Sequence, residues 1–208
     1  MRLKHFECCL TDLDVSPLAA ALEANPDLWD QVTDRQDAPG SAHHDTRAVI
    51  LLGPASLDLH SVFHDLAVQP YPPVKVLGPL VHDLIAPLCD EVYLQDIGRV
   101  MLVELKPGGV VDAHWDEGPY AAHYQRFHIV ITSEPGNVFH CGGEAVWMQP
   151  GQAWWFDHRA THLVRNESQA PRIHLIVDAV SGRYLDQVTP RPHRIGQELR
   201  FSVGDGSG

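Results

Sequence analysis

The tripeptide His114-Trp115-Asp116 follows a Pro-Gly-Gly turn signal at 107–109 and carries an imidazole and a carboxylate two positions apart. On an extended segment such residues point to the same face, so both side chains can converge on one cation. Two histidines and one carboxylate around an octahedral ion leave positions open for substrates, which suits an Fe(II) oxygenase and offers nothing to four-coordinate zinc. Because an isolated His-x-Asp also occurs in solvated loops, the predicted iron site depends on a third ligand elsewhere.

Polar residues downstream supply candidates for such a site. Residues 151–157 lead into His158 and His162, and Asn166 and Arg172 follow. Arg172 opens an apolar run, where a guanidinium is rarely left buried and unpaired. A dicarboxylate co-substrate would be a suitable partner through a bidentate pair. The alternative is that Arg172 caps a strand end at the surface.

The first part of the chain mixes helical and extended patterns. Ser16, followed by proline and good helix formers, is typical of a helix N-cap. Residues 30–46 are polar and predict a long loop, and 48–52 predict a short buried strand. Apolar residues at helical spacing predict a helix over 77–92, which Pro87 should kink or split.

From Arg99 onward, short apolar runs alternate with turn residues, which is typical of an all-β sandwich or barrel. We therefore predict a mostly β fold, a jelly roll with a mixed, partly helical N-terminal portion. The apolar runs are 100–105, 127–132, 138–141, 145–148, 153–156, 162–164 and 173–180.

These patterns divide the chain into three parts. Residues 1–95 form the mixed helical portion packed on the core, 96–182 form the β core, and 183–208 form a C-terminal extension. We expect the end of that extension, which is rich in glycine, to be disordered.

The composition argues against several classes of protein. The net charge of −12 disfavours a nucleic-acid partner, which needs clustered Lys and Arg. No apolar run approaches the roughly 20 residues that span a bilayer, and the N-terminus lacks the apolar stretch of a signal peptide. The four cysteines show no Cys-x-x-Cys spacing and are expected to be reduced thiols. We therefore predict a cytoplasmic protein without a membrane partner.

Beyond these patterns, the segment from about Arg99 to Ala179 resembles the aspartyl/asparaginyl β-hydroxylases, a branch of the Fe(II)/2-oxoglutarate-dependent dioxygenases. It is especially similar to bacterial members that hydroxylate free amino acids, such as the proline cis-hydroxylases. The resemblance implies the double-stranded β-helix, the cupin-like form of the jelly roll. It rests on His114-Trp115-Asp116, on 126–131 (Arg-Phe-His-Ile-Val-Ile), on 137–140 (Asn-Val-Phe-His), on 151–162 and on 171–178 (Pro-Arg-Ile-His-Leu-Ile-Val-Asp).

The resemblance also implies a ligand set. His114, Asp116 and His162 would hold Fe(II). The main rivals to His162 are His158, which directly follows Asp157 and is expected to be a loop residue, and His174, which shares a strand face with Arg172.

The co-substrate site is implied in the same way. Arg172 would hold the distal carboxylate of 2-oxoglutarate, and Arg126 and His128 would face the co-substrate or the carboxylate of the substrate. Within the polar loop, His43 and His44 are candidates for part of a lid over the substrate. Further candidates for substrate contact or for support of the site are His174, Trp115 and Asn166.

Two features depart from the vertebrate enzymes of the family. Those enzymes lack the carboxylate ligand, whereas Asp116 is present here. They also place a serine before the first metal histidine to help anchor 2-oxoglutarate, whereas residues 101–105 contain no hydroxyl. Asp116 therefore favours the conventional triad, and the co-substrate needs another donor.

The predicted activity is hydroxylation of an amino acid, or of an aspartyl or asparaginyl residue in a peptide, using O2 and 2-oxoglutarate. A small amino-acid-like substrate is favoured over a peptide because no peptide-docking module is evident. Two alternatives remain: a cupin-like metalloenzyme that does not use 2-oxoglutarate, and a non-catalytic binding module on the same fold. Arg172 discriminates against the first alternative, and the intact His-x-Asp and His set discriminates against the second.

Overall fold

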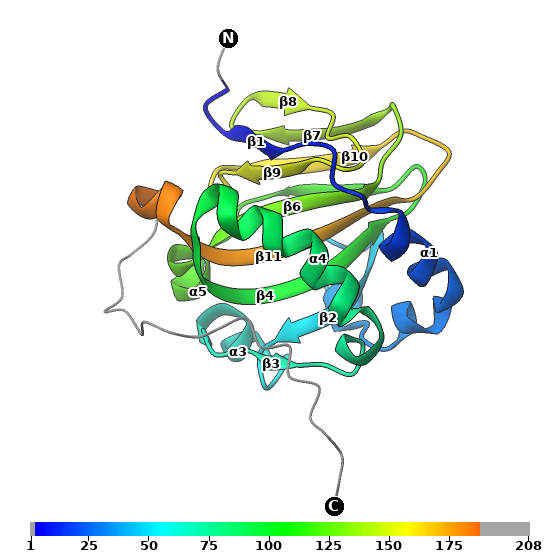
Figure 1. Cartoon of the computed structure of the whole chain (residues 1–208), viewed down its shortest axis with the longest axis horizontal. Coiled ribbons are helices and arrows are strands. Elements are labelled where there is room, and N and C mark those ends of the chain that lie inside the picture. The colour runs from blue at the N-terminus through cyan, green and yellow to red at the C-terminus, as the bar shows by residue number, and fades with distance from the viewer. Residues whose placement is uncertain (1–2, 188–208) are drawn as a thin grey trace, which may run out of the picture.

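Two antiparallel sheets form the core of the computed structural model, which describes residues 3–187 (Figure 1). The major sheet has the order β1 (Phe6–Leu10), β9 (Ala153–Phe156), β6 (Gln125–Thr132), β11 (Arg172–Ser181), β4 (Leu94–Leu105), β2 (Thr46–Gly53) and β3 (Gln69–Pro70). The minor sheet has the order β5 (Val110–His114), β10 (His162–Asn166), β7 (Asn137–Cys141) and β8 (Glu144–Val146). The predicted mostly β jelly roll is therefore confirmed. The predicted disordered end of the C-terminal extension lies outside the described residues.

The N-terminal portion does more than pack on the core, because it contributes strands to the major sheet. β1 pairs with β9, and β2 pairs with β4 over Thr46 to Leu52. The strand predicted at 48–52 is present within β2. The sequence did not predict β1, because its short stretch shows no clear alternation and its pairing partner lies far along the chain.

Helices pack on both faces of the major sheet. Those on the outer face are α1 (Ser16–Ala24), the 3₁₀ helix η1 (Pro26–Asp30), α4 (Val74–Val92) and the 3₁₀ helix η2 (Gly182–Gln187), and those on the inner face are α2 (Asp34–Asp37), α3 (Leu59–His64) and α5 (Gly118–His123). α4 crosses the sheet (Figure 1) and packs on it together with α1. Among the described residues, no helix is both long and apolar enough to cross a bilayer.

Two local expectations differ from the structure. Pro87 does not split the helix, since α4 runs unbroken from Val74 to Val92 with Pro79 and Pro87 inside it. Its buried apolar face on the sheet offsets the two lost backbone donors. Ser16 lies within α1 instead of capping it, and its amide and hydroxyl both donate to the carboxylate of Asp14.

Successive residues along the strands of the major sheet point alternately to the apolar outer face and to the inner face that carries the site. Val100 and Leu102 of β4 pack toward the helices, whereas Val103 and Leu105 point to the space between the sheets. An apolar cluster fills part of that space: Phe6, Leu105, Val111, Val130, Phe139, Cys141, Met148, Phe156 and Val164. The four cysteines are free thiols.

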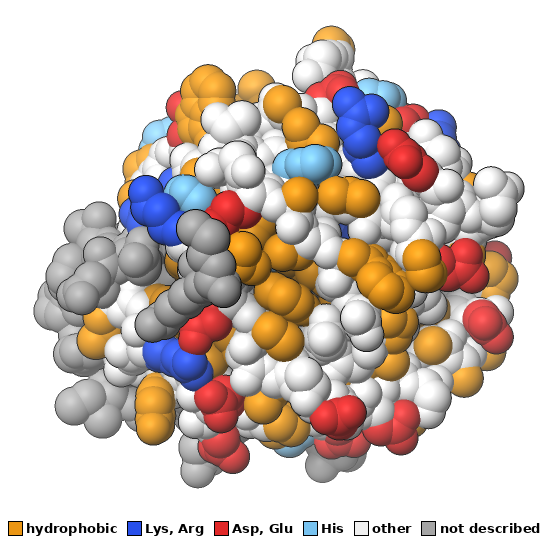
Figure 2. All heavy atoms as spheres, turned by 90° about the horizontal axis from the view of Figure 1, so that it is seen from above, with side chains coloured by type: hydrophobic (Ala, Val, Ile, Leu, Met, Phe, Trp, Pro, Cys, Tyr) orange, Lys and Arg blue, Asp and Glu red, His pale blue; other side chains and the backbone are white. Residues whose placement is uncertain are grey.

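The outer surface is mixed in charge. On the face shown in Figure 2, acidic and basic side chains are scattered around a central area of hydrophobic ones. The basic side chains described on this face lie in separate places.

Because α4 packs on the sheet through one face, the same substitution on its buried face and on its exposed face should change the free energy of unfolding by different amounts. Val81 is fully buried and Val76 is 48% exposed. We expect Val81→Ala to lower the free energy of unfolding by about 2 kcal/mol, through lost burial and a residual cavity. Val76→Ala should change it by less than about 0.5 kcal/mol. Urea unfolding of both variants measures the difference, and equal effects would mean that α4 does not pack through this face.

Candidate metal centre and adjoining cavity

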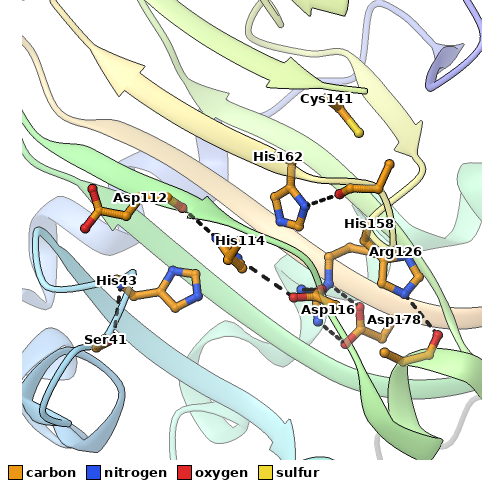
Figure 3. A network of polar contacts seen from close by, with 12 residues as sticks. Ser41, His43, Asp112, His114, Asp116, Arg126, Cys141, His158, His162 and Asp178 are labelled. Carbon is orange, nitrogen blue, oxygen red and sulfur yellow. Dashed lines mark hydrogen bonds and ion pairs between the residues drawn. The ribbon is translucent and has the colours of Figure 1, made fainter. Parts of the chain in front are cut away.

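His114, Asp116 and His162 lie together at one end of the minor sheet (Figure 3). His114 ends β5 and His162 begins β10, and the two are cross-strand partners. Their ring centroids are 4.3 Å apart, and one ligand atom from each of the three residues lies within 4.8 Å of the others. Strand pairing therefore brings together two histidines that are far apart in the sequence.

Hydrogen bonds orient both imidazoles toward a common point. Nδ1 of His114 lies 2.7 Å from the carbonyl oxygen of Asp112, and Nδ1 of His162 lies 3.0 Å from that of Ala160. A carbonyl only accepts, so each Nδ1 must carry the proton, and this leaves Nε2 free to bind a cation. Burial lowers the pKa of His162 to about 4, so this ring is neutral at pH 7.

Asp116 is an ionised carboxylate with its two oxygens turned to different partners. Oδ1 lies 3.8 Å from Nε2 of His114, and Oδ2 accepts a 2.5 Å hydrogen bond from Nη1 of Arg126. Burial raises the pKa of Asp116, but the positive charge of Arg126 and the nearby imidazoles outweigh it and lower the pKa to about 2. The set of two imidazole nitrogens and one carboxylate oxygen fits a divalent transition metal such as Fe(II).

Arg126, which we predict to face the co-substrate or the carboxylate of the substrate, binds two protein carboxylates in the structure. Its Nε and Nη2 donate to both oxygens of Asp178, at 2.7 and 2.9 Å, while Nη1 binds Asp116. Two carboxylates therefore already balance its charge. In this arrangement, Arg126 holds the carboxylate of the predicted metal ligand and lines the cavity beside it.

His158 and Asn166 serve the framework of the site. Nε2 of His158 lies 3.1 Å from the carbonyl oxygen of Ala121, and its own carbonyl accepts from the amide of Asp116. The Asn166 side chain donates to the carbonyls of Leu105, Lys106 and Ala170 and accepts from Ser168. These bonds give Asn166 a structural role and leave no donor for the substrate contact that we predicted.

Arg172 is buried at the start of β11 and does not cap a strand end at the surface. Its Nη2 lies 2.9 Å from Nδ1 of His174, and its guanidinium lies 5.6 Å from the ring centroid of Phe139. Among the described residues, no carboxylate lies within ion-pair distance of Arg172. Burial lowers its pKa to about 9.

His174 and His128 complete this buried cluster. Nδ1 of His174 accepts from Arg172 and lies 3.1 Å from Nδ1 of His128. Burial, followed by the charge of Arg172, lowers the pKa of His174 well below its usual value, so the ring is neutral and its proton is on Nε2. This buried Nε2–H has no hydrogen-bond partner in the part of the chain that the structure describes. An uncompensated cation and an unused donor together mark a place for an anion.

A cavity of about 360 Å³ opens beside the metal centre. Trp115, 58% exposed, stands at the cavity, and His43 packs edge-on against His114 with ring centroids 4.8 Å apart. His43 lines the cavity and His44 does not, and their part in a lid over the substrate stays a prediction. Arg99 is a lining residue that the sequence analysis did not identify. The sequence feature that could have identified Arg99 is a charged residue directly before the apolar run at 100–105.

The fold and this site define the class as a cupin-like jelly-roll protein with a candidate two-histidine, one-carboxylate metal centre. The sequence pattern of the family described as aspartyl/asparaginyl beta-hydroxylase matches residues 78–181, half of the 208-residue chain. The chain belongs to this family, as the resemblance predicted.

Two solved structures are similar to the chain. An oxidoreductase of the 2OG-Fe(II) oxygenase family from Burkholderia pseudomallei has a TM-score of 0.50 and 15% identity, over 86% of this chain and 95% of that one. At that identity, this likeness concerns the fold alone. A sugar phosphate isomerase from a cupin superfamily, from Silicibacter pomeroyi, has a TM-score of 0.37 and 19% identity, over 70% of this chain and 64% of that one. No curated protein matches the chain in sequence.

The paired imidazoles predict that one divalent cation binds to the unaltered chain. We expect His114→Ala or His162→Ala to weaken Mn(II) binding by more than the roughly 10–100-fold that loss of an outer hydrogen-bond partner costs. Titration calorimetry measures the affinity. His140→Ala, a half-buried histidine on the neighbouring strand β7, is the matched control and should bind Mn(II) normally. Equal weakening in all three variants would place the ion elsewhere.

Proposed function

We propose that the protein is an Fe(II)/2-oxoglutarate-dependent hydroxylase that acts on an amino acid or an aspartyl/asparaginyl-type residue. The observation that carries the proposal is the position of Arg172, a buried arginine with no carboxylate partner among residues 3–187, in the same inter-sheet space as the metal triad. Phe139 joins the two, since its ring lies near both the Arg172 guanidinium and the His162 ring, with centroids 6.1 Å apart in the latter case. Membership in the hydroxylase family supports the same activity.

Each residue of the triad has a defined part in this proposal. His114 and His162 would bind the iron through Nε2, and Asp116 would bind it through Oδ1 because Arg126 holds Oδ2. When bound, iron with 2-oxoglutarate and O2 supplies the oxidising power to hydroxylate a C–H bond. The Asp112 and Ala160 carbonyls keep both rings in the ligating tautomer.

Arg172 and His174 would anchor the distal carboxylate of 2-oxoglutarate. Arg172 supplies the charge, and Nε2–H of His174 supplies a neutral donor that has no other partner in the described part of the chain. This donor takes the place of the serine hydroxyl that residues 101–105 of β4 lack. The low pKa of His174 keeps Nδ1 available to accept from Arg172, which fixes the direction of the guanidinium.

The cavity beside the triad would hold the substrate. Its volume of about 360 Å³ suits a small molecule or a single side chain, and Trp115 and His43 form part of its wall. The four free thiols fit the reducing cytoplasm.

Arg172 gives the sharpest test of the proposed co-substrate. With Fe(II), the protein should convert 2-oxoglutarate to succinate, and Arg172→Gln should raise the apparent KM for 2-oxoglutarate by about 10–100-fold because a charge-assisted bond is lost. Succinate formation against 2-oxoglutarate concentration is the measurement. Arg165→Gln removes an exposed arginine of β10 and serves as the control. An unchanged KM in Arg172→Gln would refute the assignment.

Ligand binding alone distinguishes the proposed hydroxylase from the alternative, a cupin-like metalloenzyme that does not use 2-oxoglutarate. A hydroxylase of this type should be stabilised against thermal unfolding by N-oxalylglycine in the presence of Mn(II), and the stabilisation should disappear in Arg172→Gln. A metalloenzyme that does not use 2-oxoglutarate would bind Mn(II) but show no such stabilisation.

A further inference from the structure

Arg99, in the middle of β4, is a second buried arginine that lines the cavity beside the metal triad. It is only 8% exposed. Its guanidinium lies 3.7 Å from the ring centroid of Tyr120, and Nη2 donates to the carbonyls of Ser61 at 3.2 Å and Asp65 at 3.4 Å. Its Nε is buried and has no hydrogen-bond partner among the described residues.

The charge of Arg99 is uncompensated in the described part of the chain, where no carboxylate lies within ion-pair distance of it. Asp178 is already engaged by Arg126 and accepts a bond from the Tyr120 hydroxyl. Burial lowers the pKa of Arg99, which shows the cost of keeping the charge there. Arg47 provides a contrast, because it is less buried and still forms a bidentate pair with Glu104.

Charge balance points to one further anion in the cavity. If the proposed function holds, a divalent cation binds at Asp116 and dianionic 2-oxoglutarate binds to it and to Arg172. The three buried arginines, the two carboxylates, the cation and the co-substrate then leave one positive charge. A monoanionic ligand at Arg99 would neutralise it.

Apart from two exposed acidic residues, Asp34 and Glu117, the remaining wall of the cavity is mostly apolar. The inner face of the major sheet contributes Ala48, Ile50 and Leu52 from β2, with Met101 from β4 and Ile176 from β11. Leu59 and Phe63 of α3 line the cavity while remaining 73% and 39% exposed. Such a wall favours a ligand with a hydrophobic body.

The distance between Arg99 and the metal centre limits the length of the hydrophobic body of the ligand. Arg99 lies on β4 and Arg126 on β6, with β11 between them. Two strand spacings place their backbones about 10 Å apart. A ligand held at Arg99 therefore needs only a few carbon atoms to reach the metal centre beside Arg126.

We infer that the primary substrate is a small monocarboxylic acid with an apolar body, whose carboxylate binds Arg99. The inference deepens the proposed function and rests on it for the identity of the reaction. It makes Arg99 a determinant of specificity and disfavours an internal asparaginyl residue, which has no carboxylate to offer.

The test compares carboxylic acids with analogues of similar shape that lack the carboxylate. L-leucine and 4-methylpentanoate are titrated against L-leucinamide and 4-methylpentan-1-ol on the full chain loaded with Mn(II) and 2-oxoglutarate, by calorimetry. The acids should bind at least about 10-fold more tightly, because a charge-assisted bidentate bond is lost in the analogues. Arg99→Gln should abolish this preference, Arg99→Lys should keep part of it, and the control Arg165→Gln should keep all of it.

Several outcomes overturn the inference. They are equal binding of the acids and of the analogues without a carboxylate, no binding of either acid, and an acid preference that survives Arg99→Gln. A loss of 2-oxoglutarate affinity in Arg99→Gln as large as the loss for the acids would make Arg99 a co-substrate anchor instead. If Arg99→Gln does not fold, the comparison of acids and analogues on the unaltered chain and on Arg99→Lys decides.

Failure of the proposed function gives a different result. In that case the unaltered chain would neither bind nor turn over 2-oxoglutarate. The preference for acids, measured in the absence of 2-oxoglutarate, would still depend on Arg99. Turnover of 2-oxoglutarate without an acid preference would refute the inference alone.

Discussion

The guanidinium of Arg126 binds two carboxylates that come from different parts of the fold. Asp178 is its cross-strand partner on β11, and Asp116 lies in the segment that follows β5 of the minor sheet. The interaction therefore ties the metal-binding segment to the major sheet and fixes which oxygen of Asp116 faces the two imidazoles. Removal of one partner of a buried ion pair costs about 3–5 kcal/mol, because a charge is then left buried and unpaired. The geometry of the whole site depends on this ion pair.

The three buried arginines of the site have contrasting environments. Arg126 is fully compensated by protein carboxylates, whereas Arg99 and Arg172 are held by carbonyls, by a neutral histidine and by aromatic rings. These neutral partners orient the two guanidinium groups without cancelling their charge. The fold thus maintains two oriented positive charges at different places around one cavity, ready for anionic ligands.

Local patterns in the sequence were enough to predict the strands of the core and the shared face of His114 and Asp116. They were not enough to choose the third histidine, because that choice depends on the register between β5 and β10, and only the family resemblance pointed to His162. The partners of Arg126 and Asn166 were also not predictable, since their contacts come from strands and turns distant in sequence. Arg99 was missed for a related reason: whether an arginine on a strand faces solvent or a closed cavity is decided by α3 and Tyr120, which cover it.

The position of β1 has a consequence for how this chain reaches its folded form. Phe6 pairs with Phe156, so a strand made among the first residues waits for a partner synthesised about three quarters of the way along the chain. Until then, the edge of β1 that pairs with β9 is available to other molecules, and unpaired edges promote aggregation. Pairings of this long sequence separation also slow folding. A tag or truncation at the N-terminus should therefore affect the yield of soluble protein more than the chemistry of the distant metal centre.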